Sequence, residues 1–413
     1  MKVGLYSPFF GSTVGGGEKY LGVTAEAIRD GFPVARVEIV SPVPADRHRY
    51  ERMLALDLDG IGLVSTNPRP TALHRVAARM PALRLYRDLA VSMQAARMTL
   101  RYDIFLTMVY VLPAFSLAPR TVVLCQFPYE RGGHRWRKGP LAGWPYWLYS
   151  APYRALMPRL AGRDVELQAP VICQSEFVRH WVNEYWCRDA AVVNPPIDIP
   201  ADEPDWGAKE RIVLSVGRFF SGGHSKRHDV MVEAFRSLCD AGLEGWSLHL
   251  AGSVHRQPAD LDYLARVKAR ARGYPVELHT DATYEEVQAL YRRASVYWHA
   301  AGWSEEEGAA PITLEHFGMT TAEAMGHGAV PVVIARGGQP EVVSEGEDGF
   351  QWREPAELKA RTMQLASSSE LRERMGRAAR RSSFRFSRPE FKRRMVERLR
   401  PLVEEVAEVP ATG

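Results

Sequence analysis

The sequence of 413 residues has no long apolar segment and very few cysteines. No stretch reaches the roughly 18–20 apolar residues that a membrane-spanning helix needs. The apolar run that follows Met1-Lys2 ends after a few residues, which is too short for a secretory signal. Cys125, Cys173, Cys187 and Cys239 show no metal-binding spacing. We therefore expect a cytoplasmic protein whose cysteines are reduced and mostly buried, and we expect no zinc site.

The net charge is only +4, but the positive charge is unevenly distributed. Residues 131–163 combine arginine and lysine with tryptophan and tyrosine. This mixture suits an anionic membrane surface, because the cations can bind head groups and tryptophan prefers the interface. A solvated basic face explains the pattern equally well. No nucleic-acid-binding motif accompanies the charge, so we expect no nucleic acid partner.

The order of apolar runs predicts two α/β domains. Short β-rich runs alternate with helical patterns in the first half of the chain, at 3–7, 34–41, 103–107, 121–126 and 171–175. The alternation starts again with strands predicted at 211–217, 246–252, 276–279, 295–299 and 329–334. Such alternation is typical of doubly wound parallel sheets, whose ligands bind at the carboxyl ends of the strands. The cleft between the two domains is therefore the expected site.

The domain boundary follows from proline. Asn194-Pro-Pro-Ile-Asp198 cannot continue a helix or a central strand, and an acidic, proline-rich linker follows it. We expect an N-terminal Rossmann-like domain over residues 1–198 and a C-terminal one over 199–385. The remaining residues, 386–413, are expected to form a helix that packs back on the N-terminal domain.

Two carboxylates eight residues apart flank a predicted anion site. The segment from Glu315 to Glu323 reads Glu-His-Phe-Gly-Met-Thr-Thr-Ala-Glu. Thr320 or Thr321 can cap a helix here, and Thr320 to Glu323 has capping-box spacing. The N–H groups of the preceding loop then lie at a helix N-terminus, which favours an anion. Carboxylates on both sides of a phosphate match a sugar nucleotide, although a surface helix with ordinary acids explains the pair alone.

Two further loops carry similar chemistry. Gly15-Gly-Gly-Glu18 follows the first strand and can approach an anion closely, although a plain turn explains it equally well. It lacks the G-x-G-x-x-G pattern of nicotinamide sites. Arg218 and Lys226 follow the first strand of the second half, and together they suit a diphosphate. The paired acids Asp57 and Asp59 are the only candidate for a metal-dependent sugar site, and we do not favour it.

These motifs together resemble those of a known family. The chain resembles the retaining glycosyltransferases of the GT-B fold, specifically glycosyltransferase family 4, the group 1 transferases. The matching pieces are the glycine loop at 15–18, Cys173-Gln-Ser-Glu-Phe-Val178, Val193-Asn-Pro-Pro-Ile-Asp198, Val216-Gly-Arg218 with Lys226, the Glu315–Glu323 motif and Gly337-Gly-Gln-Pro-Glu341. The likeness runs through the chain and is strongest from Ile212 to Trp352.

The resemblance implies a role for each site residue. Glu315 contacts the donor sugar and Glu323 holds the ribose hydroxyls. Arg218 and Lys226 neutralise the leaving diphosphate, so the family uses no metal and no cofactor. The donor-binding loop is His316, Phe317, Gly318, Met319 and Thr320, and on the N-terminal side Gly16 and Gly17 approach the donor phosphate. Many members carry a histidine where this chain has Gln126, so Gln126 is the candidate for a sugar or acceptor contact.

The sequence thus predicts a metal-independent retaining glycosyltransferase that uses a nucleotide-diphosphate sugar. The acceptor is a glycan, a lipid-linked molecule or a small molecule, and the 131–163 region suggests peripheral attachment to the inner face of a membrane. Two alternatives remain open. The first alternative is a sugar-nucleotide epimerase on the same fold, and the second is a protein that binds a sugar nucleotide without catalysis.

Overall fold

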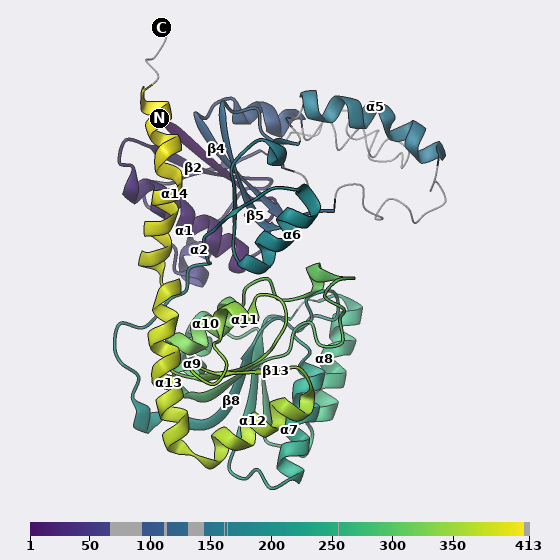
Figure 1. Cartoon of the computed structure of the whole chain (residues 1–413), viewed down its shortest axis with the longest axis vertical. Coiled ribbons are helices and arrows are strands. Elements are labelled where there is room, and N and C mark those ends of the chain that lie inside the picture. The colour runs from purple at the N-terminus through teal and green to yellow at the C-terminus, as the bar shows by residue number, and fades with distance from the viewer. Residues whose placement is uncertain are drawn as a thin grey trace. The chain divides into compact units, whose positions relative to one another are not determined.

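The computed structural model describes residues 1–66, 93–110, 114–130, 144–160, 162, 164–254 and 256–408. It contains two compact units. Unit 1 comprises Met1–Gln174, Val178–Val193 and Phe391–Gly413, and unit 2 comprises Ser175–Phe177 and Asn194–Glu390. Each unit is built around its own sheet (Figure 1). The units divide after residues 193 and 390, whereas the sequence placed these borders after 198 and 385.

In the described residues, unit 1 is built on a parallel sheet of seven strands in the order β3-β2-β1-β4-β5-β6-β7. The order reverses between β1 and β4, which is the arrangement of a doubly wound fold. The strands are β1 (Lys2–Tyr6), β2 (Arg36–Ser41), β3 (Gly62–Ser65), β4 (Ile104–Tyr110), β5 (Arg120–Phe127), β6 (Val171–Cys173) and β7 (Ala191–Val192).

Helices cover both faces of this sheet. Among them are α1 (Gly16–Gly31), α2 (Arg47–Leu54), α5 (Trp144–Leu160), α6 (Glu176–Trp186) and α14 (Arg388–Glu408). Leu21 of α1 packs with Leu5 on one face, whereas Met157 of α5 packs with Tyr6 on the other. From Phe391 onwards the last helix belongs to unit 1, where it lies along α1 (Figure 1). Phe391 packs edge-on against Tyr20, and Lys392 forms an ion pair of 2.7 Å with the buried Glu26. The last described helix therefore packs into the core of the first unit.

Unit 2 has a parallel sheet of six strands in the order β10-β9-β8-β11-β12-β13. The strands are β8 (Glu210–Val216), β9 (Ser247–Gly252), β10 (Val276–Thr280), β11 (Ala294–His299), β12 (Val330–Ile334) and β13 (Phe350–Trp352). The central strands are buried on both faces, as in other parallel sheets covered by helices. β10 is an edge strand.

Helices cover both faces of the second sheet. They are α7 (His228–Asp240), α8 (Pro258–Ala271), α9 (Tyr284–Arg293), α10 (Met319–Gly326), α11 (Gln339–Val342), α12 (Pro355–Ser367) and α13 (Ser369–Ser383). On one face, Leu248 and Leu250 of β9 pack with residues of α7, α8 and α12. On the other face, Ala251 packs with Leu290 and Tyr291 of α9. Alternate residues of β9 therefore point to opposite faces.

The predicted fold class is confirmed, since both units are α/β bodies with parallel sheets. The short strands β3, β7 and β13 were not predicted, because two to four residues are too few to show a pattern. Among the described helices, none combines the length and the apolar character needed to cross a membrane. The 131–163 segment lies partly outside the described residues, and its described part contains α5.

Candidate functional site

The candidate site begins at the carboxyl ends of β8 and β11, which are neighbouring parallel strands near the centre of the unit 2 sheet. Lys226 lies in the loop that follows β8, and Glu315 lies in the loop that follows β11. His299 is the last residue of β11. Ligands of doubly wound sheets bind at this edge, so the fold brings these three side chains to the expected place.

Lys226, Glu315 and His299 form one cluster. The Lys226 ammonium pairs with the Glu315 carboxylate, and the two side chains are only 19% and 20% exposed. The buried His299 ring lies 3.1 Å from the same carboxylate oxygen through Nε2, and burial lowers the pKa of this ring. A neutral ring beside an ionised carboxylate donates from Nε2. Burial would raise the pKa of Glu315, but Lys226 and His299 hold it well below its usual range. Glu315 is therefore a fixed negative charge.

The β8–α7 loop places the two predicted cations differently. A Cβ atom on Gly217 would lie 2.4 Å from Cγ of Lys226, so glycine is needed for the lysine stem to cross the loop here. This packing directs Lys226 towards Glu315. Arg218 is exposed on the same loop. The structure thus brings Lys226 into the carboxylate cluster and leaves Arg218 at the surface.

The loop before α10 has a different cap from the one predicted. α10 begins at Met319, and Gly318 is its N-cap with φ of 105° and no side-chain hydrogen bond. The prediction that Thr320 or Thr321 caps the helix, and that Thr320 and Glu323 form a capping box, was wrong. Thr320 is already inside the helix, where its Oγ1 lies 2.8 Å from the Tyr297 hydroxyl. Gly318 replaces the capping side chain with a left-handed turn that glycine tolerates best.

The side chains of His316 and Phe317, which precede Gly318 in this loop, are packed into unit 2. The His316 ring is buried, lies 3.2 Å from the Ile312 carbonyl through Nε2, and stacks on Phe177. Burial lowers the pKa of His316 to about 3, so the ring is neutral. Phe317 is 2% exposed. Their side chains therefore shape the loop, and any contact with a ligand falls to the backbone.

Glu323 lies on the second turn of α10 and is partly buried. The Tyr291 hydroxyl donates a hydrogen bond to its Oε2 at 3.4 Å. Tyr297, two residues before His299 on β11, links the carbonyl of Val216 at the end of β8 to α10. Sequence reasoning missed both tyrosines. The period-two spacing of Tyr297 and His299 was the signal available, because it places both on one face of the strand.

Gly16, Gly17 and Gln126 belong to unit 1. Gly16 and Gly17 are the first two residues of α1, after the extended N-cap Gly15. Gln126 is half-buried near the end of β5, and its carbonyl accepts a hydrogen bond of 3.0 Å from Gln174. The other predicted site residues all belong to unit 2.

Two weaker expectations from the sequence have structural outcomes. Asp57 forms an ion pair of 2.9 Å with Arg29, and Arg29 also donates to the backbone carbonyl of Asp59. The paired acids therefore hold a helix to a loop. Each of the four cysteines is a free thiol; Cys125 and Cys173 are buried, Cys239 is partly buried and Cys187 is exposed. The expectation of mostly buried cysteines holds for Cys125 and Cys173, and the exposed exception is Cys187, which directly follows α6.

Comparisons of structure place the fold among known glycosyltransferase structures. Sucrose-phosphate synthase from Thermosynechococcus elongatus matches with a TM-score of 0.65 at 16% identity, over 98% of this chain and 99% of that chain. HepE of Anabaena in complex with UDP-glucose gives a TM-score of 0.63 at 14% identity, over 97% and 100%. WaaG, a glycosyltransferase involved in lipopolysaccharide biosynthesis, gives 0.60 at 13% identity, over 96% and 98%. The architecture is therefore that of the GT-B fold.

Comparisons of sequence reach shorter parts of the chain. Spore coat protein SA of Bacillus subtilis is 32% identical over 24% of each chain. Two relatives are named GDP-Man:Man(3)GlcNAc(2)-PP-Dol alpha-1,2-mannosyltransferase. The one from Dictyostelium discoideum is 24% identical over 57% of this chain, and the one from Neurospora crassa is 29% identical over 52%. These alignments span 24%, 48% and 39% of the three relatives.

A family model matches most of unit 2. Residues 198–382 match the family model described as Glycosyl transferases group 1. That range contains the Lys226–Glu315–His299 cluster, the Gly318 turn and Glu323. The family match therefore lies in the second α/β unit and covers less than half of the chain.

Proposed function

We propose that this chain is a retaining glycosyltransferase that moves a sugar from a nucleotide-diphosphate sugar to an acceptor. The observation that carries the proposal is the Lys226–Glu315–His299 cluster beside the N-terminus of α10, inside the group 1 domain. A partly buried cation, a partly buried anion and a helix N-terminus lie at one edge of the sheet, and each can bind a different part of such a donor.

The diphosphate is bound by positive charge and by backbone N–H groups. The first N–H groups of α10 have no acceptor within the helix, and the helix dipole adds positive potential. Lys226 and Arg218 supply full charges on the neighbouring loop. Charge develops on the diphosphate as it leaves, so groups fixed there before the reaction stabilise the transition state. The residues from Phe317 to Thr320 hold the phosphate by their backbone.

The two carboxylates divide the hydroxyl groups of the donor. Glu315 accepts hydrogen bonds from the sugar, and Glu323 accepts them from the ribose. Lys226 and Arg218 provide the charge that a metal ion provides in other transferases, so transfer needs no metal and no cofactor. Gly16, Gly17 and Gln126 of unit 1 contact the donor phosphate, the sugar or the acceptor.

The named relatives narrow the choice of donor and acceptor. Two of them carry GDP-Man and an acceptor ending in PP-Dol in their names, and HepE was solved with UDP-glucose. We propose a lipid-linked glycan acceptor held at the inner face of a membrane, which also explains the basic and aromatic residues of 131–163. Sedimentation with vesicles of anionic lipid at low salt tests the membrane contact, and protein that stays in the supernatant contradicts it.

Incubation with a panel of donors that includes GDP-mannose and UDP-glucose, with and without acceptor, tests the activity. Transfer only with acceptor, and retention of the anomeric configuration by NMR, support the proposal. Consumption of donor without acceptor, giving an isomer, indicates an epimerase, and binding without turnover indicates a non-catalytic protein. Added Mg²⁺ is expected to leave the rate unchanged.

Variants test the site itself. Lys226→Met is expected to lower kcat by about 10²-fold, as when one transition-state donor is removed elsewhere. Glu315→Gln is expected to lower turnover more than folding, and Glu323→Ala to weaken donor binding. Lys268→Met and Glu285→Gln change the same residue types at exposed positions on α8 and α9 and serve as controls. Full activity in the three site variants would overturn the assignment.

A further inference from the structure

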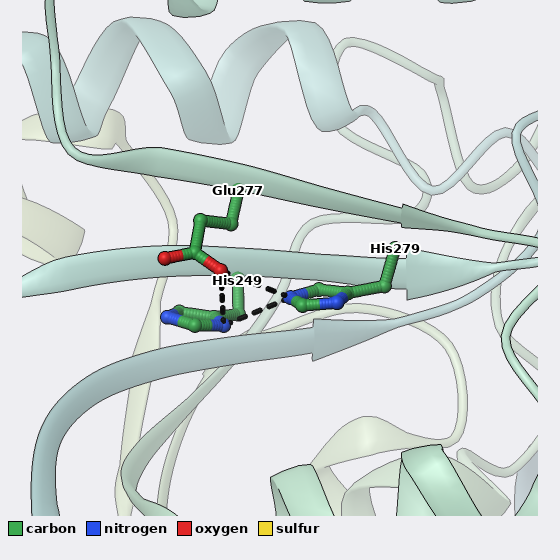
Figure 2. A group of neighbouring side chains, drawn as sticks. All are labelled: His249, Glu277 and His279. Atoms are coloured by element: carbon green, nitrogen blue, oxygen red, sulfur yellow. Dashed lines mark hydrogen bonds and ion pairs between the residues drawn. The ribbon is translucent and has the colours of Figure 1, made fainter.

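Three side chains with metal-binding atoms meet within the sheet of unit 2, apart from the Lys226–Glu315 cluster. They are His249 of β9 and Glu277 and His279 of β10 (Figure 2). His249 Nδ1 lies 2.9 Å from His279 Nε2, and the Glu277 Oε2 lies 3.7 Å from each of these nitrogens. Among the described residues, no other group of three His, Cys, Asp or Glu side chains brings its ligand atoms within 4.8 Å of one another.

Strand register accounts for this meeting. β9 and β10 are parallel, and Glu277 pairs with His249 while His279 pairs with Ala251. Residues two apart on a strand share a face, so Glu277 and His279 point to the same side as His249. Ala251 is small and leaves room for the His279 ring to lean back over β9. The two imidazole rings are nearly parallel, with their planes 13° apart.

The three ligand atoms have the spacing that a metal ion needs. A triangle with sides of 2.9, 3.7 and 3.7 Å has a circumscribed radius of about 2.0 Å, which equals the usual distance from zinc to a histidine nitrogen or a carboxylate oxygen. The edges of an ideal tetrahedral site are about 3.3 Å long. The nitrogens therefore need to separate by about 0.4 Å, and the carboxylate needs to approach by a similar amount.

The surroundings of the cluster suit a bound ion. Ser247, two residues before His249, places its Oγ 3.0 Å from His249 Nε2. That hydroxyl can accept the Nε2–H, which leaves Nδ1 unprotonated towards the cluster; ligating histidines are commonly oriented in this way. The His249 side chain is 5% exposed, whereas those of His279 and Glu277 are 30% and 62% exposed. Solvent can therefore reach the ion and complete its coordination.

We propose that His249, Glu277 and His279 form a binding site for a divalent transition-metal ion, with zinc as the best fit. Two imidazoles and one carboxylate are donors that zinc accepts, and water fills the fourth position. Magnesium and calcium prefer sites made only of oxygen and are excluded by the two rings.

The ion would act as a clip on the edge of the sheet. Its ligands come from β9 and β10, the two strands at one edge of the sheet, so binding would fasten the edge strand β10 to β9. Glu210 and Arg293 lie near His249 and pair with each other at 2.9 Å, which leaves Glu277 as the carboxylate that offsets the charge of the ion. The ligands lie within the strands, whereas Lys226 and Glu315 follow the strands' carboxyl ends, so this site is separate from the proposed transfer chemistry.

Metal titration of the full chain, purified without a histidine tag and stripped of metal, tests the proposal. Competition with a chromophoric chelator in the absence of any nucleotide sugar should show one Zn²⁺ per chain. Glu277→Gln and His279→Gln each remove one ligand at an exposed or partly exposed position, and each should weaken binding at least tenfold. Zn²⁺ at 100 times its dissociation constant should raise the melting temperature of the parent protein by about 5 °C or more.

The control is His48→Gln. His48 is exposed and has one carboxylate partner, Glu51, at 3.3 Å, so it offers a histidine and an acid without a third ligand. This variant should bind Zn²⁺ as the parent does. Co²⁺ in place of Zn²⁺ should give visible absorption bands that Glu277→Gln alters and His48→Gln does not. Absence of bound Zn²⁺, equal affinity in all three variants, or equal binding of Mg²⁺ would each overturn the proposal.

Discussion

Removing the cation of the Lys226–Glu315 pair tests how unit 2 stabilises a partly buried charge. Loss of one partner from a fully buried ion pair costs about 3–5 kcal/mol, because the other charge is left without compensation. Here both side chains are about one-fifth exposed, and His299 still donates to Glu315. We therefore expect Lys226→Met to destabilise unit 2 by about 2 kcal/mol. Glu315→Gln should cost less, because it leaves a lysine that can turn towards solvent.

A double-mutant cycle isolates the pair from other effects. Lys226→Met combined with Glu315→Gln should be more stable than the two separate penalties predict, by about 1–2 kcal/mol. Urea unfolding that is monitored by hydrogen exchange of peptides from unit 2 measures these free energies of unfolding without a contribution from unit 1. Penalties that simply add would refute the coupling.

The same cycle has a pH dependence of known sign. The pKa of Glu315 is lowered in the folded state, so its contribution to stability is complete above the unfolded-state value near 4.5 and disappears as the pH falls through the folded-state pKa. Lys226→Met removes part of that contribution. The difference between the parent and Lys226→Met should therefore be largest near pH 7 and shrink on acidification. A penalty that stays constant down to pH 3 would contradict the assignment of the charge to Glu315.

Three shorter predictions concern the framework of unit 2. Gly318→Ala should lower the melting temperature of unit 2 and weaken donor binding, because a Cβ atom there would clash with Gln339 at a φ of 105°. Gly346→Ala is the control: its φ is 76° and no atom lies near, so its melting temperature should fall only by the smaller cost of the backbone conformation. Arg380→Lys should cost about 2 kcal/mol in urea unfolding, because buried Arg380 donates to three backbone carbonyls and lysine cannot match that fork. Burial lowers the pKa of His228 to about 3, so between about pH 3 and 6.5 only the unfolded state takes up this proton. His228→Phe should therefore reduce the slope of stability against pH by one proton in this range.

The sequence predicted the order of elements better than their ends. Runs such as Arg211–Gly217 and Ala329–Ile334 are apolar on both faces, and this marks a covered parallel strand whatever surrounds it. The cap of α10 was predicted wrongly because threonine and glycine are both good caps. The choice between them depends on Gln339 and Thr321, eighteen residues apart, which share a hydrogen bond behind the turn. No local pattern contains that contact.

For the candidate site, the sequence likewise identified residues but not the contacts between them. Lys226 and Glu315 could be selected from the sequence because each follows a strand and has a charge. Their ion pair could not, because it joins residues 89 positions apart and depends on the close approach of Lys226 to Gly217. The His249–Glu277–His279 cluster was missed for a related reason. Its three members become neighbours only through the register of β9 and β10, which the sequence of either strand alone does not fix.

The charge state of Glu315 bears on which group takes the acceptor proton in the proposed reaction. An efficient general base has a pKa near the working pH, and the pKa of Glu315 is held well below even its ordinary value. Glu315 is therefore a poor proton acceptor, although it is well suited to accept hydrogen bonds from sugar hydroxyls. His299 is buried, and its nearest ring nitrogen already faces Glu315. In the proposed mechanism the departing phosphate oxygen is left as the base, on the face of the sugar from which it leaves. That places the acceptor on the same face and leads to retention. An inverted product would therefore contradict both the stereochemistry and the assignment of the base.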